Sequence, residues 1–238
     1  MTDSRKSGTL LAIEGIDGAG KRTQTELLGK ALAARGISLA HFSFPRYESF
    51  FGQLVARFLN GEFGPLEAVD PHFSALLYAG NRLEAKPELD AALAAGKTLL
   101  TDRYIASNLA HQTARVPAAQ RADFLAWLRR LEYGVYGLPV EDLVIFLRLA
   151  PASAQQMVGR KATRNYTDRK HDLQESNLAH LRETSLIYDQ LAAQANWVTI
   201  ECAGPDGAVK PAPEIHKAIF AAVESRVLFH RSTPQMAG

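Results

Sequence analysis

A glycine-containing turn between an apolar run and a helical pattern constrains this chain more than any other feature. The stretch LLAIEGIDGAGKRTQTELL covers residues 10–28, with Gly15, Gly20 and Lys21 in the spacing G-x-x-x-x-G-K. This spacing is typical of a loop whose backbone N–H groups hold phosphates at a helix N-terminus, where the helix dipole also favours anions. The sequence therefore predicts a nucleotide-binding loop, rather than a plain turn that uses glycine for a positive φ.

The residue after Lys21 departs from the usual motif. A Ser or Thr hydroxyl normally stands there and ligates Mg²⁺, but this chain has Arg22. A guanidinium has no acceptor and cannot ligate a cation. Thr23 lies about 100° further round the helix and is poorly aimed to replace the hydroxyl. Two interpretations stay open: Arg22 adds positive charge near the donor phosphates or turns toward Asp102, or it faces solvent while water and carboxylates hold the metal.

Strand-like apolar runs alternate with helical patterns along the rest of the chain. The runs cover 9–13, 38–44, 97–101, 143–149 and 197–201, and the helical patterns cover 21–35, 50–60, 70–95, 105–113, 119–133, 152–161, 173–194 and 211–224. Near-continuous apolar strands separated by helices are typical of a parallel sheet that is covered on both faces. We therefore expect one α/β domain over residues 1–238, with disordered ends at about 1–8 and 230–238.

Composition narrows the classes of function. Hydrophobic residues make up 47% and charged residues 22%, which is ordinary for a globular protein, and the net charge of +2 is too small for a nucleic-acid coat. The single cysteine, Cys202, excludes an internal disulfide and a Cys-based zinc site. No signal peptide or membrane span is expected. We expect small-molecule partners, neither nucleic acid nor membrane, and a cytoplasmic location.

Charged residues stand at the end of one predicted strand and in one predicted loop. Asp102 and Arg103 follow the run at 97–101. Ligands of open α/β sheets bind at the carboxyl ends of the strands, so beside a phosphate loop this pair predicts site residues rather than a strand-end ion pair.

A basic cluster occupies a predicted lid at about 159–171, with members Arg160, Lys161, Arg164, Arg169 and Lys170. It predicts arginines that close over phosphates, or alternatively a solvated charged face.

Other chemistries are disfavoured. The chain has no Asn-Lys-x-Asp segment for reading guanine and no Asp-x-x-Gly switch after a strand. The seven histidines show no metalloprotease spacing, and Ser107 lacks the G-x-S-x-G elbow of an acyl-transfer nucleophile.

Aromatic residues such as Phe44, Tyr47 and Tyr78 are candidates for stacking on a base, or for ordinary core packing.

Five motifs together resemble the thymidylate kinase family, over residues 10–226. They are EGIDGAGK, FPRY, YAGNR, DRYIASNLAHQ and KHDLQESNLAHLRETSLIY. The resemblance implies a P-loop NTPase fold with a five-stranded parallel sheet, helices on both faces and an arginine-rich lid, usually as a homodimer. It also implies ATP-dependent, Mg²⁺-supported phosphorylation of dTMP to dTDP.

The resemblance also assigns residues. ATP binding falls to Gly15, Ile16, Asp17, Gly18, Ala19, Gly20, Lys21, Arg22 and Thr23. Binding of dTMP falls to Asp17, Phe44, Tyr47, Tyr78, Arg82, Arg103, Ser107, Asn108, His111 and Gln112. In these assignments Phe44 stacks on thymine and Tyr78 lines the base pocket. Tyr47 and Arg103 hold the acceptor phosphate, while Arg82 and Gln112 hydrogen-bond the base. Catalysis falls to Asp17, Lys21, Arg103, Arg160, Arg164 and Arg169, and we expect Mg²⁺ at Asp17, Asp102 and Glu175.

Within the family, Gly18 and the basic lid resemble the arrangement in which the lid, not the loop, supplies the catalytic arginine. Two positions depart from the family pattern: His111 stands where Tyr is usual, close to the sugar, and Arg148 stands where Asp is common. Two alternatives therefore stay open. The chain is a kinase for another pyrimidine nucleotide, which His111 favours, or a nucleotide-binding regulatory protein without turnover, which Arg22 favours.

Overall fold

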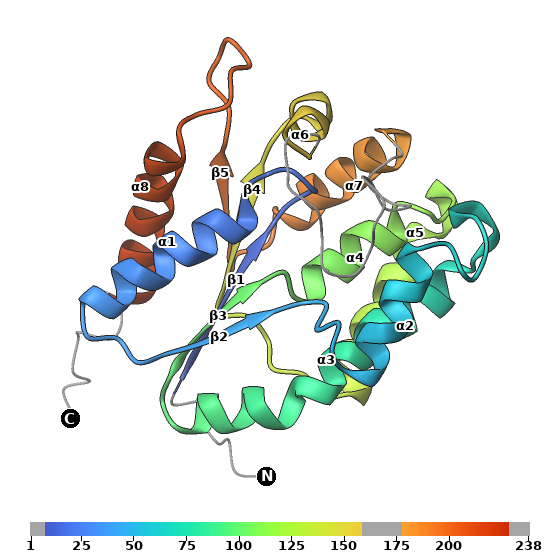
Figure 1. Ribbon diagram of the computed structural model, residues 1–238, viewed down its shortest axis with the longest axis horizontal. Coiled ribbons are helices and arrows are strands. Elements are labelled where there is room, and N and C mark those ends of the chain that lie inside the picture. The colour runs from blue at the N-terminus through green and yellow to red at the C-terminus, as the bar shows by residue number, and fades with distance from the viewer. Residues whose placement is uncertain (1–7, 159–177, 229–238) are drawn as a thin grey trace.

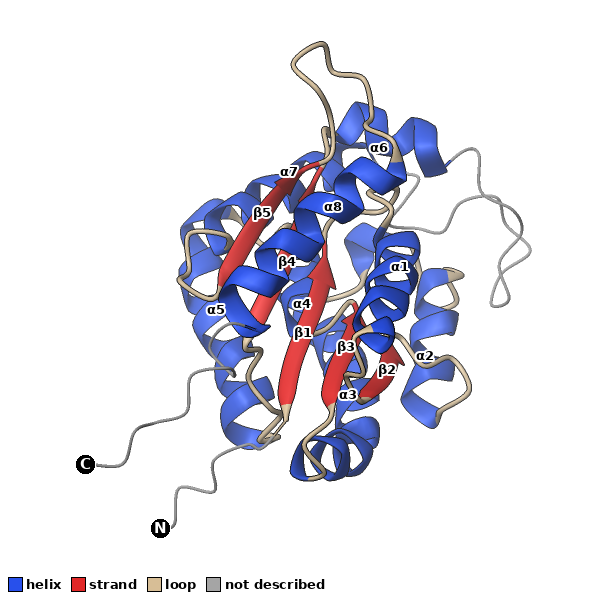
Figure 2. Ribbon diagram, turned by 90° about the vertical axis from the view of Figure 1, so that its left-hand side faces the viewer, coloured by secondary structure: helices blue, strands red, loops and turns tan. Residues whose placement is uncertain are grey.

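The sheet has five parallel strands. A computed structural model describes residues 8–158 and 178–228. The strands are β1 (Thr9–Glu14), β2 (Leu39–Ser43), β3 (Thr98–Asp102), β4 (Leu143–Arg148) and β5 (Trp197–Glu201), in the order β2-β3-β1-β4-β5 (Figure 2). The predicted five-stranded parallel sheet is confirmed. Because β1 is central, the loop that follows it lies at the middle of the carboxyl edge of the sheet.

Helices cover both faces of the sheet (Figures 1 and 2). One face carries α1 (Lys21–Ala34) and α8 (Ala212–Val223); the other carries α3 (Pro71–Ala94), α4 (Ile105–Thr113), α5 (Arg121–Arg129) and α7 (Leu178–Leu191). Helix α2 (Phe50–Leu59) packs on α3, and α6 (Pro151–Val158) follows β4. Short turns complete the described chain at Leu66–Ala68, Ala118–Gln120, Arg130–Val135 and Glu224–Leu228.

The core explains the apolar strand patterns. Leu10, Leu11, Ala12 and Ile13 of β1 have no exposed surface, as expected for a strand with helices on both sides. Each buried leucine or isoleucine contributes about 1.5–3 kcal/mol relative to an exposed one. A second, smaller cluster joins α2 to α3, with Val55, Phe58 and Leu77 among its members.

The predicted boundaries are wrong in two informative places. The first strand extends one residue further and ends at Glu14, which is wholly buried. The helix predicted at 119–133 is divided: α5 ends at Arg129 and a π-helical turn follows over Arg130–Val135. A π turn is wider than an α turn and often occurs at functional sites. Here it includes Glu132, which is buried against α3.

Parts of several expectations lie outside the described residues. These are the ends at 1–7 and 229–238, the lid, and the adjoining parts of the helical patterns at 152–161 and 173–194. Across residues 8–158 and 178–228, no helix combines the length and the apolar character needed to cross a membrane.

A buried carboxyl at the other end of the sheet predicts a pH-dependent stability. Glu141 precedes β4, is 4% exposed and accepts a hydrogen bond from Tyr133 Oη (2.8 Å), and burial raises its pKa to about 7. An unfolded Glu titrates near pH 4.3, so between these values the folded protein binds more protons than the unfolded chain. The contribution of Glu141 to the free energy of unfolding is thus complete below about pH 4 and is lost as the pH rises through 7.

The free energy of unfolding of the wild type should therefore fall between pH 5 and pH 8. We expect this fall to be smaller in Glu141→Gln by roughly 2–3 kcal/mol. Urea denaturation of wild type and variant at both pH values measures it. The same pH dependence in both proteins would contradict the expectation.

Candidate active site

The loop between β1 and α1 has the geometry that the motif predicts. Gly15, Gly18 and Gly20 have φ values of 145°, 91° and 87°, which L-residues with side chains rarely adopt. Lys21 Nζ donates to the carbonyl oxygens of Gly15 (2.9 Å) and Ile16 (2.9 Å). The lysine therefore folds back along the loop, with its ammonium inside the turn.

Helix α6 closes one side of this loop. A Cβ atom on Gly18 would lie 2.1 Å from the carbonyl oxygen of Ala154, which belongs to α6. Position 18 thus has no room for a side chain, so an arginine could not stand there without moving the helix. That the lid supplies a catalytic arginine stays a prediction.

The side chain of Arg22 faces solvent. It is 87% exposed, and its Nε donates to Glu26 Oε1 (3.0 Å), one turn further along α1. Thr23 is exposed as well. Lys21 points into the loop, and the next residue lies about 100° further round the helix, so it points outward. Of the two interpretations of Arg22, this structure shows the solvent-facing orientation, and a role of Arg22 toward ATP stays a prediction.

Arg103 connects the end of β3 to the loop. Its guanidinium pairs with Asp17, and Nη1 donates to Ser107 Oγ (3.0 Å) and lies 3.4 Å from His111 Nε2. Burial alone would lower the pKa of this guanidinium, but the nearby carboxylates, Asp17 first, raise the net pKa above its ordinary value. Arg103 therefore connects the loop, through Asp17, to helix α4, through Ser107. It keeps its charge beside the place where phosphates would bind.

Helix α4 brings several predicted residues together behind Arg103. Ser107, Asn108, His111 and Gln112 are all at least nine-tenths buried. Gln112 Oε1 accepts from Ser74 Oγ (2.8 Å) and Arg115 Nη1 (2.9 Å). Within residues 8–158 and 178–228, Asn108 Oδ1 and His111 Nδ1 have no hydrogen-bond partner. Buried polar atoms without partners are costly, so these two are candidates for contact with a ligand.

The histidines of this region are neutral at physiological pH. Burial, followed by the charge of Arg103, lowers the pKa of His111 well below its ordinary value. Burial lowers the pKa of His180 to about 4, and its ring centroid lies 5.6 Å from that of His111. An uncharged imidazole can stand beside a guanidinium without charge repulsion.

Arg82 is buried and paired, not a surface residue of its helix. Its Nε donates to Glu132 Oε2 (2.9 Å), and its Nη2 donates to Glu132 Oε1. Asn108 Nδ2 donates to the same Oε1 (2.8 Å). Burial alone would lower the pKa of Arg82, but Glu132 raises the net value above its ordinary level. The predicted base-contacting arginine is thus locked in one orientation, and its contact with thymine stays a prediction.

The aromatic residues occupy two environments. Phe44 is 4% exposed and lies between Tyr104 (ring centroids 5.9 Å apart) and Phe42 (6.5 Å), so in this structure it packs in the core. Tyr78 is half-buried and meets Phe58 edge to face at 6.3 Å. Stacking of Phe44 on a base, and the base-pocket role of Tyr78, stay predictions.

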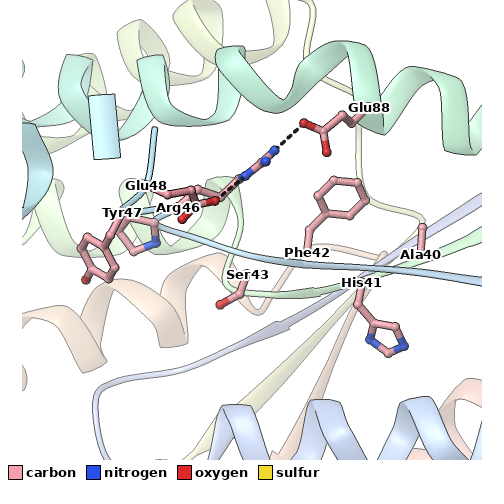
Figure 3. Close-up of a pocket in the computed structure, with 9 residues that line it drawn as sticks. Ala40, His41, Phe42, Ser43, Arg46, Tyr47, Glu48 and Glu88 are labelled. Atoms are coloured by element: carbon pink, nitrogen blue, oxygen red, sulfur yellow. Dashed lines mark hydrogen bonds and ion pairs between the residues drawn. The ribbon is translucent and has the colours of Figure 1, made fainter. Parts of the chain in front are cut away.

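Tyr47 and Arg46 diverge after β2. Figure 3 shows Arg46 directed toward Glu88 and Tyr47 directed away from it, at a cavity of about 410 Å³ beside the edge strand. Arg46 Nη1 donates to Glu88 (2.7 Å) and Nε to Glu48 (3.2 Å). Its guanidinium therefore belongs to the surface between β2 and α3. The Tyr47 side chain therefore points away from the Arg46–Glu88 ion pair.

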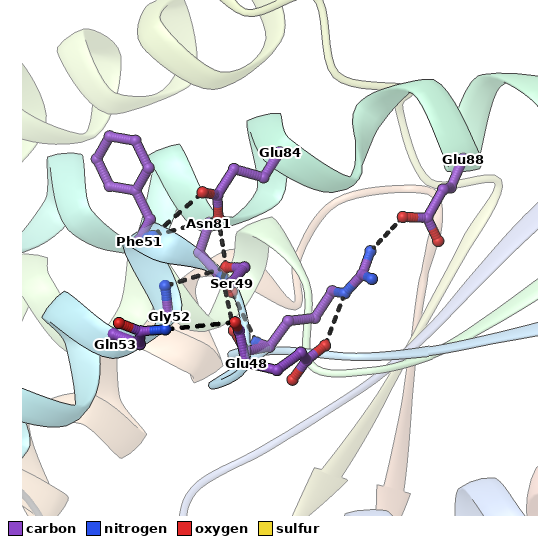
Figure 4. Close-up of polar contacts among 9 residues, drawn as sticks. Glu48, Ser49, Phe51, Gly52, Gln53, Asn81, Glu84 and Glu88 are labelled. Carbon is purple, nitrogen blue, oxygen red and sulfur yellow. Dashed lines mark hydrogen bonds and ion pairs between the residues drawn. The ribbon is translucent and has the colours of Figure 1, made fainter.

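Polar contacts to α3 fix this turn (Figure 4). Asn81 Oδ1 accepts from Arg46 N (2.9 Å), and Asn81 Nδ2 donates to Arg46 O (3.2 Å) and to Ser49 Oγ (2.8 Å). Glu84 accepts hydrogen bonds from Phe51 N and Ser49 Oγ. Asn81, from the YAGNR motif, therefore holds the FPRY turn in place against α3.

Two buried carboxylates were missed by sequence reasoning, Glu14 and Glu132. Both have no exposed surface. Glu14 interrupts an apolar strand immediately before the loop, and a buried charge needs partners, so its position was a usable signal. Glu132 gives no such signal, because its burial depends on the π turn.

The remaining predicted residues are only partly described. Within the described ranges, no group of three or more His, Cys, Asp or Glu side chains could hold a metal ion. Glu175, Arg160, Arg164 and Arg169 lie outside those ranges. Arg148, the other departure from the family pattern, ends β4 and pairs on the surface with Asp189 (2.8 Å) and Glu201 (2.8 Å).

Comparison with known proteins places the chain in a family. The family model described as thymidylate kinase matches residues 13–211. Thymidylate kinase of Mycobacterium tuberculosis is 34% identical over 195 residues, which cover 80% of this chain and 90% of that protein. Human thymidylate kinase is 34% identical over 149 residues, or 63% of this chain and 65% of that protein. A solved thymidylate kinase from Candida albicans shares the fold, with a TM-score of 0.72 and 21% identity over 92% of each chain. The loop motif, the sheet order and these matches agree, and the chain belongs to the thymidylate kinase family.

Proposed function

We propose that this protein transfers the γ-phosphoryl group of ATP to the phosphate of dTMP, giving ADP and dTDP. The observation that carries the proposal is the pairing of Arg103 with Asp17 at the phosphate loop, where Arg103 Nη1 (3.5 Å) and the buried Lys21 Nζ (2.9 Å) both donate to Gly15 O. This places two cations and a helix N-terminus at one point of the carboxyl edge, as transfer between two phosphates requires. The buried, unpartnered Asn108 Oδ1 and His111 Nδ1 support an acceptor site on the α4 side.

The reaction asks for positioning and charge neutralisation rather than covalent catalysis. The loop N–H groups and Lys21 would hold the donor phosphates, and Arg103 would hold the acceptor phosphate. The acceptor oxygen is already anionic, so no general base is needed. The lid arginines Arg160, Arg164 and Arg169 would neutralise charge in the transition state, which can contribute a rate factor of about 10³ or more.

Magnesium is the metal that fits this site. Mg²⁺ keeps several waters and is usually bound by one or two carboxylates and by substrate phosphates. We therefore assign it to Asp17 of the loop and Asp102 at the end of β3, together with the phosphates of ATP. Glu175 completes the proposed set. The ion would neutralise phosphate charge. Exposure of Arg22 agrees with a metal held without any side chain from that position.

We expect Arg22→Ala to leave kcat, the KM for ATP and the half-saturating Mg²⁺ concentration within about twofold of wild type, because an exposed ion pair contributes little. Asp17→Asn should instead raise the Mg²⁺ requirement for dTMP turnover. Mg²⁺ titrations of initial rate compare them. A changed Mg²⁺ response in Arg22→Ala would restore the interpretation that Arg22 acts at the phosphates.

The acceptor preference tests the proposed function directly. Purified protein with ATP and Mg²⁺ should phosphorylate dTMP in preference to dUMP, CMP, UMP and AMP. A site whose buried polar groups match one base leaves them unpaired with another, which costs affinity. ADP release measured with each acceptor decides it. A preference for CMP or AMP would end the proposal, and absence of turnover with every acceptor would favour the regulatory alternative.

One observation favours the second candidate, a kinase of wider pyrimidine range. The unpartnered Nδ1 of His111 could meet a sugar hydroxyl, and the histidine is smaller than the tyrosine usual in the family. UMP accepted as well as dTMP in the same assay would establish this candidate.

We also infer a homodimer. Phe73, Leu76 and Leu83 of α3 and Phe50 of α2 are large apolar side chains that are between 37% and 68% exposed. Phe73, Leu76 and Leu83 recur at helical spacing along α3, and Phe50 begins α2, which packs on α3. Exposed large apolar side chains on two packed helices support a contact face for a second copy. A monomeric mass in solution by light scattering would contradict the inference.

A further inference from the structure

Glu14 stands directly before the phosphate loop but belongs to no part of its motif. It is the last residue of β1 and has no exposed surface. Burying an unpaired carboxylate costs several kcal/mol. The position is therefore tolerable only because of the partners that surround it.

Those partners lie mainly at the start of α4. Oε1 accepts from the backbone N–H groups of Tyr104 (2.6 Å) and Ser107 (3.2 Å), and Oε2 accepts from Ser107 Oγ (2.6 Å) and Tyr188 Oη (2.8 Å). Tyr104 is the N-cap of α4 and makes no side-chain cap of its own. Glu14 thus caps α4 from a neighbouring strand, where the helix dipole also favours a negative charge.

The residue before this cap is Arg103, whose backbone is strained. Its φ is 65°, the one positive value among the non-glycine residues of the described ranges. Such a conformation costs on the order of 1 kcal/mol and persists only where the surroundings determine it. Arg103 N donates to Ile13 O (3.0 Å), and the next N–H donates to Glu14. Consecutive residues of β1 therefore hold the chain on both sides of Arg103.

We propose that Glu14 is a positioning residue for phosphoryl transfer: its carboxylate keeps Arg103 in this conformation, aimed at Asp17 and the loop. Glu14 itself does not touch the phosphates. The inference rests on the proposed role of Arg103 toward the acceptor phosphate, but the hydrogen bonds that carry it are independent of the acceptor's identity.

Three variants separate position from charge. Glu14→Ala removes every contact. Glu14→Asp keeps the charge but is one methylene shorter, so it cannot reach all four donors. In Glu14→Gln the amide oxygen can still accept from the two N–H groups, while its NH₂ donates to the hydroxyls, which also accept. Glu141→Ala removes another buried carboxyl from the opposite end of the sheet and serves as the control for general destabilisation.

The experiment measures initial rates with varied dTMP and varied ATP, below the melting temperature of each variant. Because misplacement by about 1 Å can cost about 10²-fold, we expect kcat/KM for dTMP to fall by roughly tenfold in Glu14→Asp and 10²-fold in Glu14→Ala. The KM for ATP should change less than about threefold, and Glu14→Gln should recover most of the activity. Glu141→Ala should leave the ratio of the two KM values unchanged.

Equal losses toward dTMP and ATP in Glu14→Asp, or wild-type dTMP kinetics in that variant, would overturn the proposal. If Glu14→Ala does not fold, Glu14→Asp and Glu14→Gln decide. Crystal structures of these two variants give a readout that does not depend on dTMP. The positive φ of Arg103 and its pairing with Asp17 should be lost in Glu14→Asp and kept in Glu14→Gln. An undisturbed Arg103 in Glu14→Asp would refute the positioning role even if wild type preferred another acceptor, whereas a wild type inactive on dTMP would refute only the proposed function.

Discussion

Arg103→Lys is expected to weaken dTMP binding by at least tenfold, although the substitution keeps the charge. The guanidinium of Arg103 is a planar fork that meets Asp17, Ser107 and the edge of His111 at the same time. A lysine ammonium is a point charge and cannot reproduce bidentate contact with a phosphate while it keeps these partners. Losing one good charge-assisted hydrogen bond of about 1.5–3 kcal/mol corresponds to a tenfold or larger loss of affinity. Calorimetric titration with dTMP measures it.

Arg121→Lys is the matched control. Arg121 is 21% exposed, close to the 17% of Arg103, and it also pairs with a single carboxylate, Glu183 (2.7 Å), but it lies at the start of α5. Its lysine variant should bind dTMP as wild type does. Unchanged affinity in Arg103→Lys would mean that the arginine is only the structural partner of Asp17.

The loop and the sheet were predictable because each has a local signature. Gly15, Gly20 and Lys21 have the spacing of a phosphate loop and stand between an apolar run and a helical pattern, the context that this loop requires. Strand β1 is apolar on both faces because helices cover both. The strand order also brings the ends of β1 and β3 side by side, with Ile13 paired to Asp102. This explains why Asp17 and Arg103 meet, although they are 86 positions apart along the chain.

The partners of the site arginines were not predictable, because they depend on long-range packing. No local pattern around Arg82 indicates that Glu132, 50 residues later in the π turn, is its partner. Phe44 could stack on a base or pack in the core, and no local pattern distinguishes the two. Arg22 is a different case. The motif marks its position as a site residue, but the residue after Lys21 lies about 100° further round the helix, so its side chain points outward.

Glu132→Ala is expected to cause the largest loss of stability of any substitution considered. Arg82 and Glu132 have side chains that are 2% and 0% exposed, and Asn108 donates to the same carboxylate. Removing one partner of a buried ion pair leaves an uncompensated charge, which costs about 3–5 kcal/mol. For a chain of this size the melting temperature should fall by on the order of 10 °C. Urea and thermal denaturation measure both quantities.

The double variant Arg82→Met, Glu132→Leu separates stability from recognition. Replacing both members of a buried pair with apolar residues of similar volume is often neutral or stabilising, so the double variant should recover most of the stability lost in Glu132→Ala. If Arg82 also contacts the base, this stable variant should still lose its preference for dTMP over CMP, because the guanidinium is absent. A stable variant with intact preference would show that Arg82 serves only the fold. If Glu132→Ala were as stable as wild type, Arg82 would have found water or another partner in place of the Glu132 carboxylate. The buried Arg82–Glu132 pair would then contribute far less to stability than its burial implies.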